Sequence, residues 1–347
     1  MATQKALWLP NIGEEFTLGT TDIPEPGPGE VLVKLESSAL NPLDWKIQKH
    51  GFYIVKEYPA ILGEEGAGVV EKVGEGVSNL TKGDKIFFQT AFGGKYSSFK
   101  EYVIVAADVA GKIPDNISFD QAASISVGII PFAVAFYAQQ PHGFAFTAPF
   151  KADGGVGKYA GQPVVIFGGA SSLGQYAIQL AKISGFSPII TTASLHNKDL
   201  LHSLGATHVL DRKLSAAALR EEVAKITSSP ITHAFDAISL EDTQQAAYDL
   251  LASGGKLAIV TPPKLKEVEG SGKQVTLVFG SFQLPHNRAL GVQFMQELTK
   301  WLAEGTIKPN AVEVLPGGLN GVSAGLRRLE NNEVSGKKLV IHPAETA

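Results

Sequence analysis

A strand, a turn of small residues and a helix follow one another between Pro163 and Gly185. Residues 164–167 are wholly apolar, as expected for a strand that is buried on both faces of a parallel sheet. The next five residues, Gly-Gly-Ala-Ser-Ser, predict a tight turn. From Leu173 the apolar residues recur three or four positions apart, which indicates a helix that ends near Gly185. This order of elements is typical of an α/β domain.

The turn also predicts a ligand. A helix N-terminus attracts phosphate, and a glycine-rich turn between a strand and a helix binds the pyrophosphate of a dinucleotide. A strict G-x-G-x-x-G motif would place glycine at Ser171, whereas here only Gly169 and Gly174 keep the spacing. A tight connection without a ligand is therefore the alternative. We assign the turn and the start of the helix to a cofactor site: Gly169, Ala170, Ser171, Ser172 and Leu173.

The composition excludes several classes of function. The chain has 347 residues, which suggests about two domains, and no cysteine, which removes disulfides, thiol catalysis and cysteine-ligated zinc. The net charge is −4 with no block of like charges, so we expect neither nucleic acid nor a membrane as a partner. The first residues are not an apolar signal segment, and the apolar run 127–138 is too short to span a bilayer. We therefore expect a cytoplasmic protein.

Strands and helices alternate from residue 163 to residue 303, which predicts a doubly wound parallel sheet. We expect further strands over 188–193, 208–210, 233–238, 256–260 and 274–279, and helices over 198–204, 215–227, 241–251 and 288–303. Residues 1–110 predict a β-rich region instead. The chain ends in a predicted strand over 338–342, so we expect this β-rich domain to be discontinuous.

A long connection leads into the alternating region. A helix is predicted over 119–139, and the loop that follows it, over 141–158, exceeds the usual length of a connection. Aromatic side chains in this loop, with Phe144 among them, suggest a flap over a substrate pocket. The alternative is a surface excursion that buries a small satellite core.

The end of the second predicted strand indicates which nucleotide is bound. An NAD site carries Asp or Glu about 20 residues after the glycines, where it holds the ribose 2′-hydroxyl. Ser194 takes that position here, and Asn197 and Lys198 follow it. A hydroxyl, an amide and a cation bind a 2′-phosphate, which a carboxylate would repel. Arg212 adds a planar cation, so NADPH is favoured, although Lys198 alone is also compatible with a solvated surface lysine.

Segments spread over nearly the full length carry a resemblance to a known family: Asn41-Pro-Leu-Asp-Trp-Lys46, Pro59 to Val77, Gly168 to Gly174, Ser203-Leu-Gly-Ala206 and Ser335-Gly-Lys-Lys-Leu-Val-Ile341. By these segments the chain resembles the medium-chain dehydrogenase/reductase superfamily, in its zinc-independent quinone oxidoreductase and enoyl reductase branch. The first and third segments look most like the fungal toxD-like and trans-acting enoyl reductases.

The resemblance implies a GroES-like, β-rich catalytic domain over 1–125 and 308–347, and a Rossmann NADP-binding domain over 126–307. Zinc-dependent relatives keep a ligand cysteine where Asn41 stands and a ligand histidine where Glu64 stands. The histidines here show no H-x-x-x-H arrangement, so we expect no metal. What remains is hydride delivery from NADPH to an electron-poor acceptor, either a C=C bond conjugated to a carbonyl or a quinone.

The resemblance also implies site residues. In relatives the Asn-Pro-x-Asp-x-Lys segment lies beside the nicotinamide, which assigns Asn41, Pro42, Asp44 and Lys46 to the site. We expect Lys46 to be a cation near the cofactor phosphate or the substrate carbonyl, with a surface lysine as the alternative. Asp44 either fixes a turn or transfers a proton.

Aromatic residues complete the predicted substrate site. Trp45, together with Asn41 and Phe144, is expected to line the pocket. Tyr53 is a candidate donor to the carbonyl oxygen. Ile238 and Phe279, at the ends of two predicted strands, are assigned to the cofactor site.

Three further questions stay open at the level of sequence. A catalytically weak nucleotide-binding partner or sensor of the same fold is the alternative to an enzyme. The substrate is expected to be a small apolar molecule, with a polyketide-synthase-type protein as a potential partner. The chain is expected to be a monomer or a homodimer.

Overall fold

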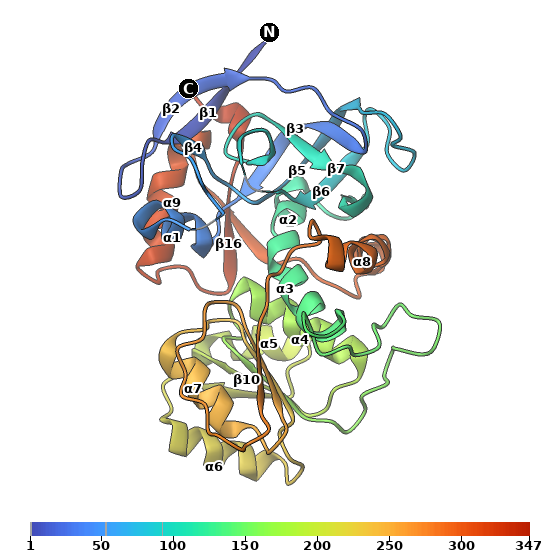
Figure 1. Cartoon of the computed structure of the whole chain (residues 1–347), viewed down its shortest axis with the longest axis vertical. Coiled ribbons are helices and arrows are strands. Elements are labelled where there is room, and N and C mark those ends of the chain that lie inside the picture. Colours follow the sequence, from blue (N-terminus) through green and yellow to red (C-terminus); the bar gives the residue numbers. More distant parts are fainter. Residues whose placement is uncertain (1, 53, 92) are drawn as a thin grey trace. The chain divides into compact units, whose positions relative to one another are not determined.

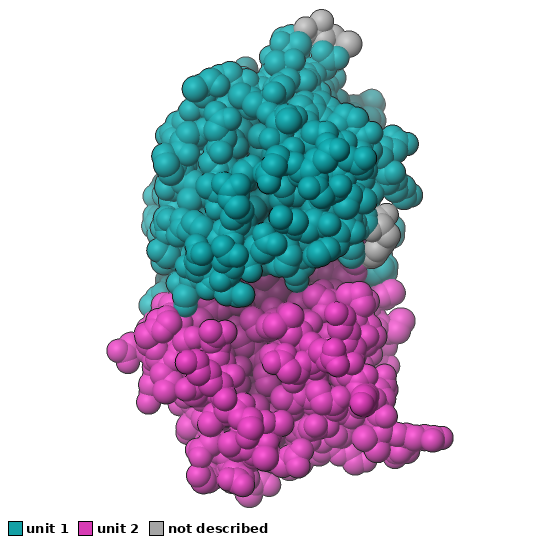
Figure 2. Space-filling model, turned by 90° about the vertical axis from the view of Figure 1, so that its left-hand side faces the viewer, with its two compact units in different colours: residues 1–127, 282–347 teal, residues 128–281 magenta. Residues whose placement is uncertain are grey.

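The computed structural model describes residues 2–52, 54–91 and 93–347. The chain forms two compact units, which comprise residues 1–127 with 282–347 and residues 128–281 (Figure 2). The second boundary differs from the predicted one at 308, because helix α8 (Pro285–Ala303) belongs to the first unit. There Arg288 Nε donates to Asp108 Oδ2 at 2.8 Å, and Asn116 Nδ2 donates to the Leu302 carbonyl at 3.0 Å.

A six-stranded parallel sheet organises the second unit (Figure 1). Its strands lie in the order β11 (His208–Asp211), β10 (Ile189–Ala193), β9 (Val164–Phe167), β12 (His233–Asp236), β13 (Lys256–Ile259) and β14 (Gln274–Leu277). The strand order reverses beside β9, as in a doubly wound sheet, and ligands bind at the carboxyl ends of the strands at such a point. The predicted fold class of this region is confirmed.

Helices connect these parallel strands except β13 and β14, which a loop joins. The connecting helices are α4 (Ser172–Ser184), α5 (Lys198–Leu204), α6 (Ala216–Ile226) and α7 (Glu241–Leu250), with a short helix η3 (Leu195–Asn197) before α5. The single helix predicted over 119–139 is divided into α2 (Phe119–Ala123) and α3 (Ser126–Tyr137). Buried apolar residues from both the strands and the helices form the core of the unit, as amphipathic helices on a sheet require.

Two sheets form the first unit. The smaller has the order β2 (Thr17–Asp22), β1 (Thr3–Leu9) and β4 (Ala60–Ile61). The larger has the order β15 (Ala311–Val314), β16 (Lys337–Ile341), β3 (Glu30–Ala39), β5 (Glu65–Val73), β6 (Lys85–Gln89) and β8 (Gly111–Lys112), and β7 (Tyr102–Ala106) also pairs with β3. Because β16 pairs with β3, the two ends of the chain share one sheet.

The helices of the first unit include two that the sequence pattern did not predict, α1 (Pro42–His50) and α9 (Val322–Glu330). The shorter helical turns are η1 (Gly94–Tyr96), η2 (Ala107–Val109), η4 (Gly318–Gly321) and η5 (Pro343–Glu345). Among the residues that the structure describes, no helix is both long enough and apolar enough to cross a bilayer.

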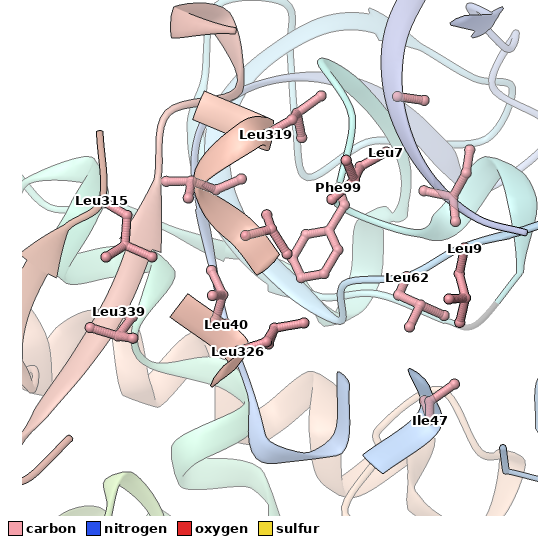
Figure 3. Close-up of a cluster of buried hydrophobic side chains, with 14 residues drawn as sticks. Leu7, Leu9, Leu40, Ile47, Leu62, Phe99, Leu315, Leu319, Leu326 and Leu339 are labelled. Atoms are coloured by element: carbon pink, nitrogen blue, oxygen red, sulfur yellow. The ribbon is translucent and has the colours of Figure 1, made fainter. Parts of the chain in front are cut away.

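An apolar cluster lies at the centre of the first unit (Figure 3). Leu40 and Leu339 belong to it and are almost fully buried. Asn41 directly follows Leu40, and Lys338 directly precedes Leu339 on β16, where successive side chains point to opposite faces. The polar residues described below therefore border an environment of low polarity.

Candidate functional site

Close contacts shape the glycine turn of the second unit. Gly168 has a φ of +75°, in the left-handed region that favours glycine. A Cβ at Gly169 would overlap the Thr191 hydroxyl, and a Cβ at Gly174 would overlap the Gly168 carbonyl. Thr191 is itself fixed, because its hydroxyl donates to the Ile166 carbonyl at 2.7 Å. Glycine at these positions lets strand, turn and helix approach one another closely.

Ser171 begins helix α4. Its hydroxyl accepts a hydrogen bond from the Gly174 N–H at 3.0 Å, so it acts as the N-cap of the helix. Ala170, Ser172 and Leu173 are half-buried around it. A helix end of this kind presents backbone N–H groups and the positive end of the helix dipole to an anion. The turn therefore fits the pyrophosphate of a dinucleotide.

The structure brings two predicted residues together at the carboxyl ends of β10 and β11. Arg212 Nε donates to the Ser194 hydroxyl at 2.9 Å. Lys198 is exposed at the start of α5, while the buried Asn197 places its amide nitrogen 3.2 Å from His196 Nε2. Ser194 offers a hydroxyl at the strand end where an NAD site has a carboxylate. Two exposed cations, Lys198 and Arg212, lie nearby in the sequence or in space. These residues together suit a phosphate.

Two other predicted cofactor residues follow later strands of the same sheet. Ile238 lies against the glycine turn, because a Cβ built at Gly168 would overlap its side chain. Its N–H donates to Asp236 Oδ1 at 2.9 Å, which fixes the backbone after β12. Phe279 is half-buried after β14, and its assignment to the cofactor site stays a prediction.

Aromatic side chains of the loop over 141–158 pack inward, whereas residues 151–154 and 156–158 are exposed. The Phe144 ring lies 5.3 Å from the Phe136 ring and 5.7 Å from the His233 ring. Phe146 lies 5.5 Å from Phe136 and 4.5 Å from Tyr159, as centroid distances. These aromatic side chains form the satellite core that was the alternative for this loop, so the structure gives Phe144 a packing role where the sequence suggested a substrate pocket.

Asp44 shapes the start of helix α1 in the first unit. Asp44 Oδ2 accepts from the Asn41 N–H at 2.8 Å, and Oδ1 accepts from the Gly63 N–H at 3.3 Å. The side chain is fully buried, and this burial is the main reason why the pKa of Asp44 is raised to about 7. Of its two predicted roles, the structure displays the turn-fixing one.

Asn41 is joined to a buried ion pair. Its Nδ2 donates to Glu65 Oε1 at 3.1 Å, and its Oδ1 accepts from Lys338 Nζ at 2.6 Å. Lys338 Nζ also lies 2.6 Å from Glu65 Oε1, and Glu65 Oε2 accepts from the Val127 N–H at 2.7 Å. Both ends of the Asn41 amide are therefore used inside this network, and its assignment to the substrate pocket stays a prediction.

Glu64 is a third buried acid at this place, and the sequence analysis assigned it no function. Burial, followed by the charges of Asp44 and Glu65, raises its pKa well above the ordinary value, and Lys338 opposes the shift. Its Oε1 is buried without a hydrogen-bond partner. Two adjacent glutamates inside the apolar segment 60–70 are the sequence signal that could have revealed this cluster, because acids are rarely buried unless they are paired.

Lys46 and Trp45 lie next to each other on α1. Lys46 Nζ is 5.8 Å from the centroid of the Trp45 ring, and that ring also contacts His50 at 6.3 Å. Pro42 occupies the first turn of the helix, where its missing N–H costs nothing. Tyr53 lies outside the described residues. Among the described residues, no group of three or more His, Cys, Asp or Glu side chains is arranged to hold a metal ion.

Models of two protein families match the chain. Residues 27–115 match the alcohol dehydrogenase GroES-like domain, and residues 172–292 match the zinc-binding dehydrogenase family. The first match lies in the first unit, and the second covers most of the parallel sheet.

Several known proteins are similar to the chain over its whole length. The trans-enoyl reductase ACTTS2 of Alternaria alternata is 32% identical and is aligned over 98% of this chain and 99% of its own. The trans-enoyl reductase BOA5 of Botryotinia fuckeliana is 30% identical over 91% of this chain and 92% of its own. One solved structure, that of the crotonyl-CoA carboxylase/reductase AntE in complex with NADP, has a TM-score of 0.78 at 17% identity. The match covers 99% of this chain and 96% of that chain, and it shows a likeness of fold.

Proposed function

Since the chain belongs to the zinc-independent enoyl reductase branch of the medium-chain dehydrogenase/reductase superfamily and is an oxidoreductase, we propose that it uses NADPH to reduce a C=C bond conjugated to a carbonyl. The observation that carries this proposal is the 32% identity to a trans-enoyl reductase over 98% of the chain. The cofactor supplies the hydride, and the protein orients the acceptor. A quinone is the alternative acceptor of the same hydride.

The choice of NADPH is supported by the ends of β10 and β11. Arg212 and Ser194 are hydrogen-bonded there, and Lys198 opens the next helix. These groups would bind the 2′-phosphate, while the glycine turn with Ser171 would hold the pyrophosphate. The solved structure of AntE contains NADP, which agrees with this choice at the level of the fold.

Lys46 is proposed as the cation that meets the substrate carbonyl or a cofactor phosphate. A cation near the carbonyl oxygen stabilises the enolate that forms when hydride adds to the β-carbon. Lys46 is held near the Trp45 ring, and Lys49 on the same helix forms an ion pair with Glu330 at 3.9 Å. The two lysines of α1 thus have different surroundings, which makes Lys49 a matched control.

The substrate is proposed to be a small apolar enoyl compound that a polyketide-synthase-type partner provides. The relatives named trans-enoyl reductases support this class of substrate. Turnover of an enoyl chain attached to such a synthase, at a higher kcat/KM than that of the free thioester, would support the partner.

The test is NADPH oxidation with a panel of enoyl thioesters, enones and quinones. We expect turnover with at least one conjugated C=C substrate. Lys46→Ala should lower kcat/KM about tenfold to a hundredfold, the loss of one charge-assisted contact, whereas Lys49→Ala should leave it unchanged.

Two results would contradict the proposal. NADPH binding without turnover of any substrate would favour the nucleotide-binding partner or sensor over the enzyme. Equal activity of Lys46→Ala and Lys49→Ala would remove Lys46 from the site while leaving the reaction class intact.

A further inference from the structure

Three carboxylic acids and one ammonium group are buried together in the first unit. Asp44 lies on α1, Glu64 directly precedes β5, Glu65 begins β5, and Lys338 lies on β16. Asp44 and Glu65 are fully buried, Lys338 is 5% exposed, and Glu64 is 4% exposed. One ammonium cannot neutralise three carboxylates, and an unbalanced buried charge is costly, so the cluster retains at least one proton on an acid near neutral pH.

Hydrogen bonds indicate which acid keeps that proton. Asp44 accepts two backbone N–H bonds, which favour the ionised form, although burial raises its pKa to about 7. Glu65 accepts from Lys338, from the Asn41 amide and from the Val127 N–H. Among the described residues, Glu64 Oε1 has no donor, and Lys338 is the charge that favours ionisation of this group.

Glu64 is also the acid of the cluster that is closest to solvent. It alone of the three keeps some exposure, 4% against 0% for Asp44 and Glu65. It follows Leu62 and Gly63, and Leu62 belongs to the apolar cluster drawn in Figure 3. Glu64 is therefore close in sequence to an apolar core, and its Oε1 has no hydrogen-bond partner among the described residues.

We propose that Glu64 is the proton donor of the reduction. This inference rests on the proposed function, because a C=C reduction needs one proton in addition to the hydride. The hydride adds to the β-carbon, and the π electrons of the C=C bond move to form an enolate. The Glu64 O–H bond then breaks with its electron pair left on the carboxylate, and the enolate electron pair forms the new C–H bond at the α-carbon. Water returns the proton to Glu64 afterwards.

The surrounding charges set the pH range of this step. Asp44 on α1 and Glu65 on β5 disfavour ionisation of Glu64, and Lys338 on β16 favours it. Burial, which is the largest effect, and the two acids outweigh Lys338, so the pKa of Glu64 is raised well above its ordinary value. The rate of α-protonation should then be level at low pH and fall as the pH rises past this raised pKa.

The experiment compares Glu64→Gln, Glu64→Asp and Glu71→Gln with the wild type. Glu71 lies on β5, the strand that Glu64 directly precedes, and forms a surface ion pair with Lys82 at 3.5 Å, so it is the matched control. Turnover is followed over pH in H₂O and D₂O, with the stereochemistry of deuterium at the α-carbon as a second measurement. Carbon-13 NMR of the glutamate carboxyls in the cofactor-free protein reports directly on a neutral Glu64.

We expect Glu64→Gln to lower kcat by about 10²–10⁴-fold, with unchanged NADPH affinity, no alkaline decline and loss of stereochemical control at the α-carbon. Glu64→Asp should retain part of the rate, which separates the lost acid from a folding defect, and Glu71→Gln should match the wild type. A Glu64→Gln enzyme with the wild-type rate, pH profile and stereochemistry would overturn the assignment of Glu64. A wild-type protein without turnover would instead overturn the proposed function, and the donor with it.

Discussion

Lys338 Nζ lies 2.6 Å from Glu65 Oε1 in the interior of the first unit, where the Lys338 side chain is 5% exposed and that of Glu65 is 0% exposed. Asn41 contacts both partners through its amide. The desolvation of the two charges offsets much of their attraction, so the intact pair adds little to stability by itself. Removing one partner of the ion pair is costly, because the charge of the other partner is then left buried and unpaired.

Lys338→Met should therefore lower the free energy of unfolding by about 3–5 kcal/mol. The matched control is Lys337→Met on the same strand, whose ion pair with Glu313 at 2.7 Å is partly exposed and should cost no more than about 1 kcal/mol. Urea unfolding of both variants gives the comparison. The double variant Lys338→Met/Glu65→Gln should regain part of the loss, and a strictly additive double variant would show that the two side chains do not interact.

Asp44 makes stability depend on pH in an unusual direction. Its pKa is raised to about 7 in the folded protein, mainly by burial. At pH values between the ordinary pKa of an aspartate and 7, the native state therefore binds more protons than the unfolded state. Stability contributed by this group is thus present at acidic pH and is lost as the pH rises through that window.

Asp44→Asn should make the unfolding free energy decrease less steeply between about pH 5 and pH 7. The slope should change by no more than about 1.4 kcal/mol per pH unit. The measurement is urea unfolding of wild type and variant across this range, where the slope and not the absolute stability is compared. Parallel slopes for the two proteins would show that Asp44 is ionised throughout.

Gly169→Ala should destabilise the second unit, because the new Cβ would overlap the hydroxyl of the buried Thr191. Overpacking of this kind costs about 1–3 kcal/mol. Thr191→Ala alone removes the hydrogen bond to Ile166 and gives the reference, and the double variant should be more stable than the sum of the two single effects predicts. If the double variant is as unstable as that sum, the contact is not what requires glycine.

The parallel sheet was predictable from the sequence because its signals are local. Residues 164–167 form a wholly apolar strand, and the glycine turn and the helix follow at once. The adjacency of Ser194 and Arg212 was also accessible, since both follow parallel strands that are neighbours in the sheet.

The buried network of the first unit was not predictable in the same way. Asn41 and Lys338 are 297 positions apart, and only the pairing of β16 with β3 brings them together. Helix α1 has nine residues, which is too short for a clear apolar period, so the burial of Asp44 on it left no pattern to detect. The cluster that contains Glu64 was therefore not predictable from the sequence, because a strand at the chain end and a short helix build it.

Ser194→Asp should shift the cofactor preference toward NADH. A carboxylate at this strand end would repel the 2′-phosphate and accept the hydrogen bonds of a ribose 2′-hydroxyl, while Arg212, which now donates to Ser194 at 2.9 Å, would pair with the new acid. We expect the ratio of the Kd for NADH to that for NADPH to fall at least tenfold, measured by fluorescence titration. Ser203→Asp, on the exposed side of α5, is the control, because it adds the same charge away from this strand end. An unchanged ratio for Ser194→Asp would mean that the 2′-phosphate is bound elsewhere.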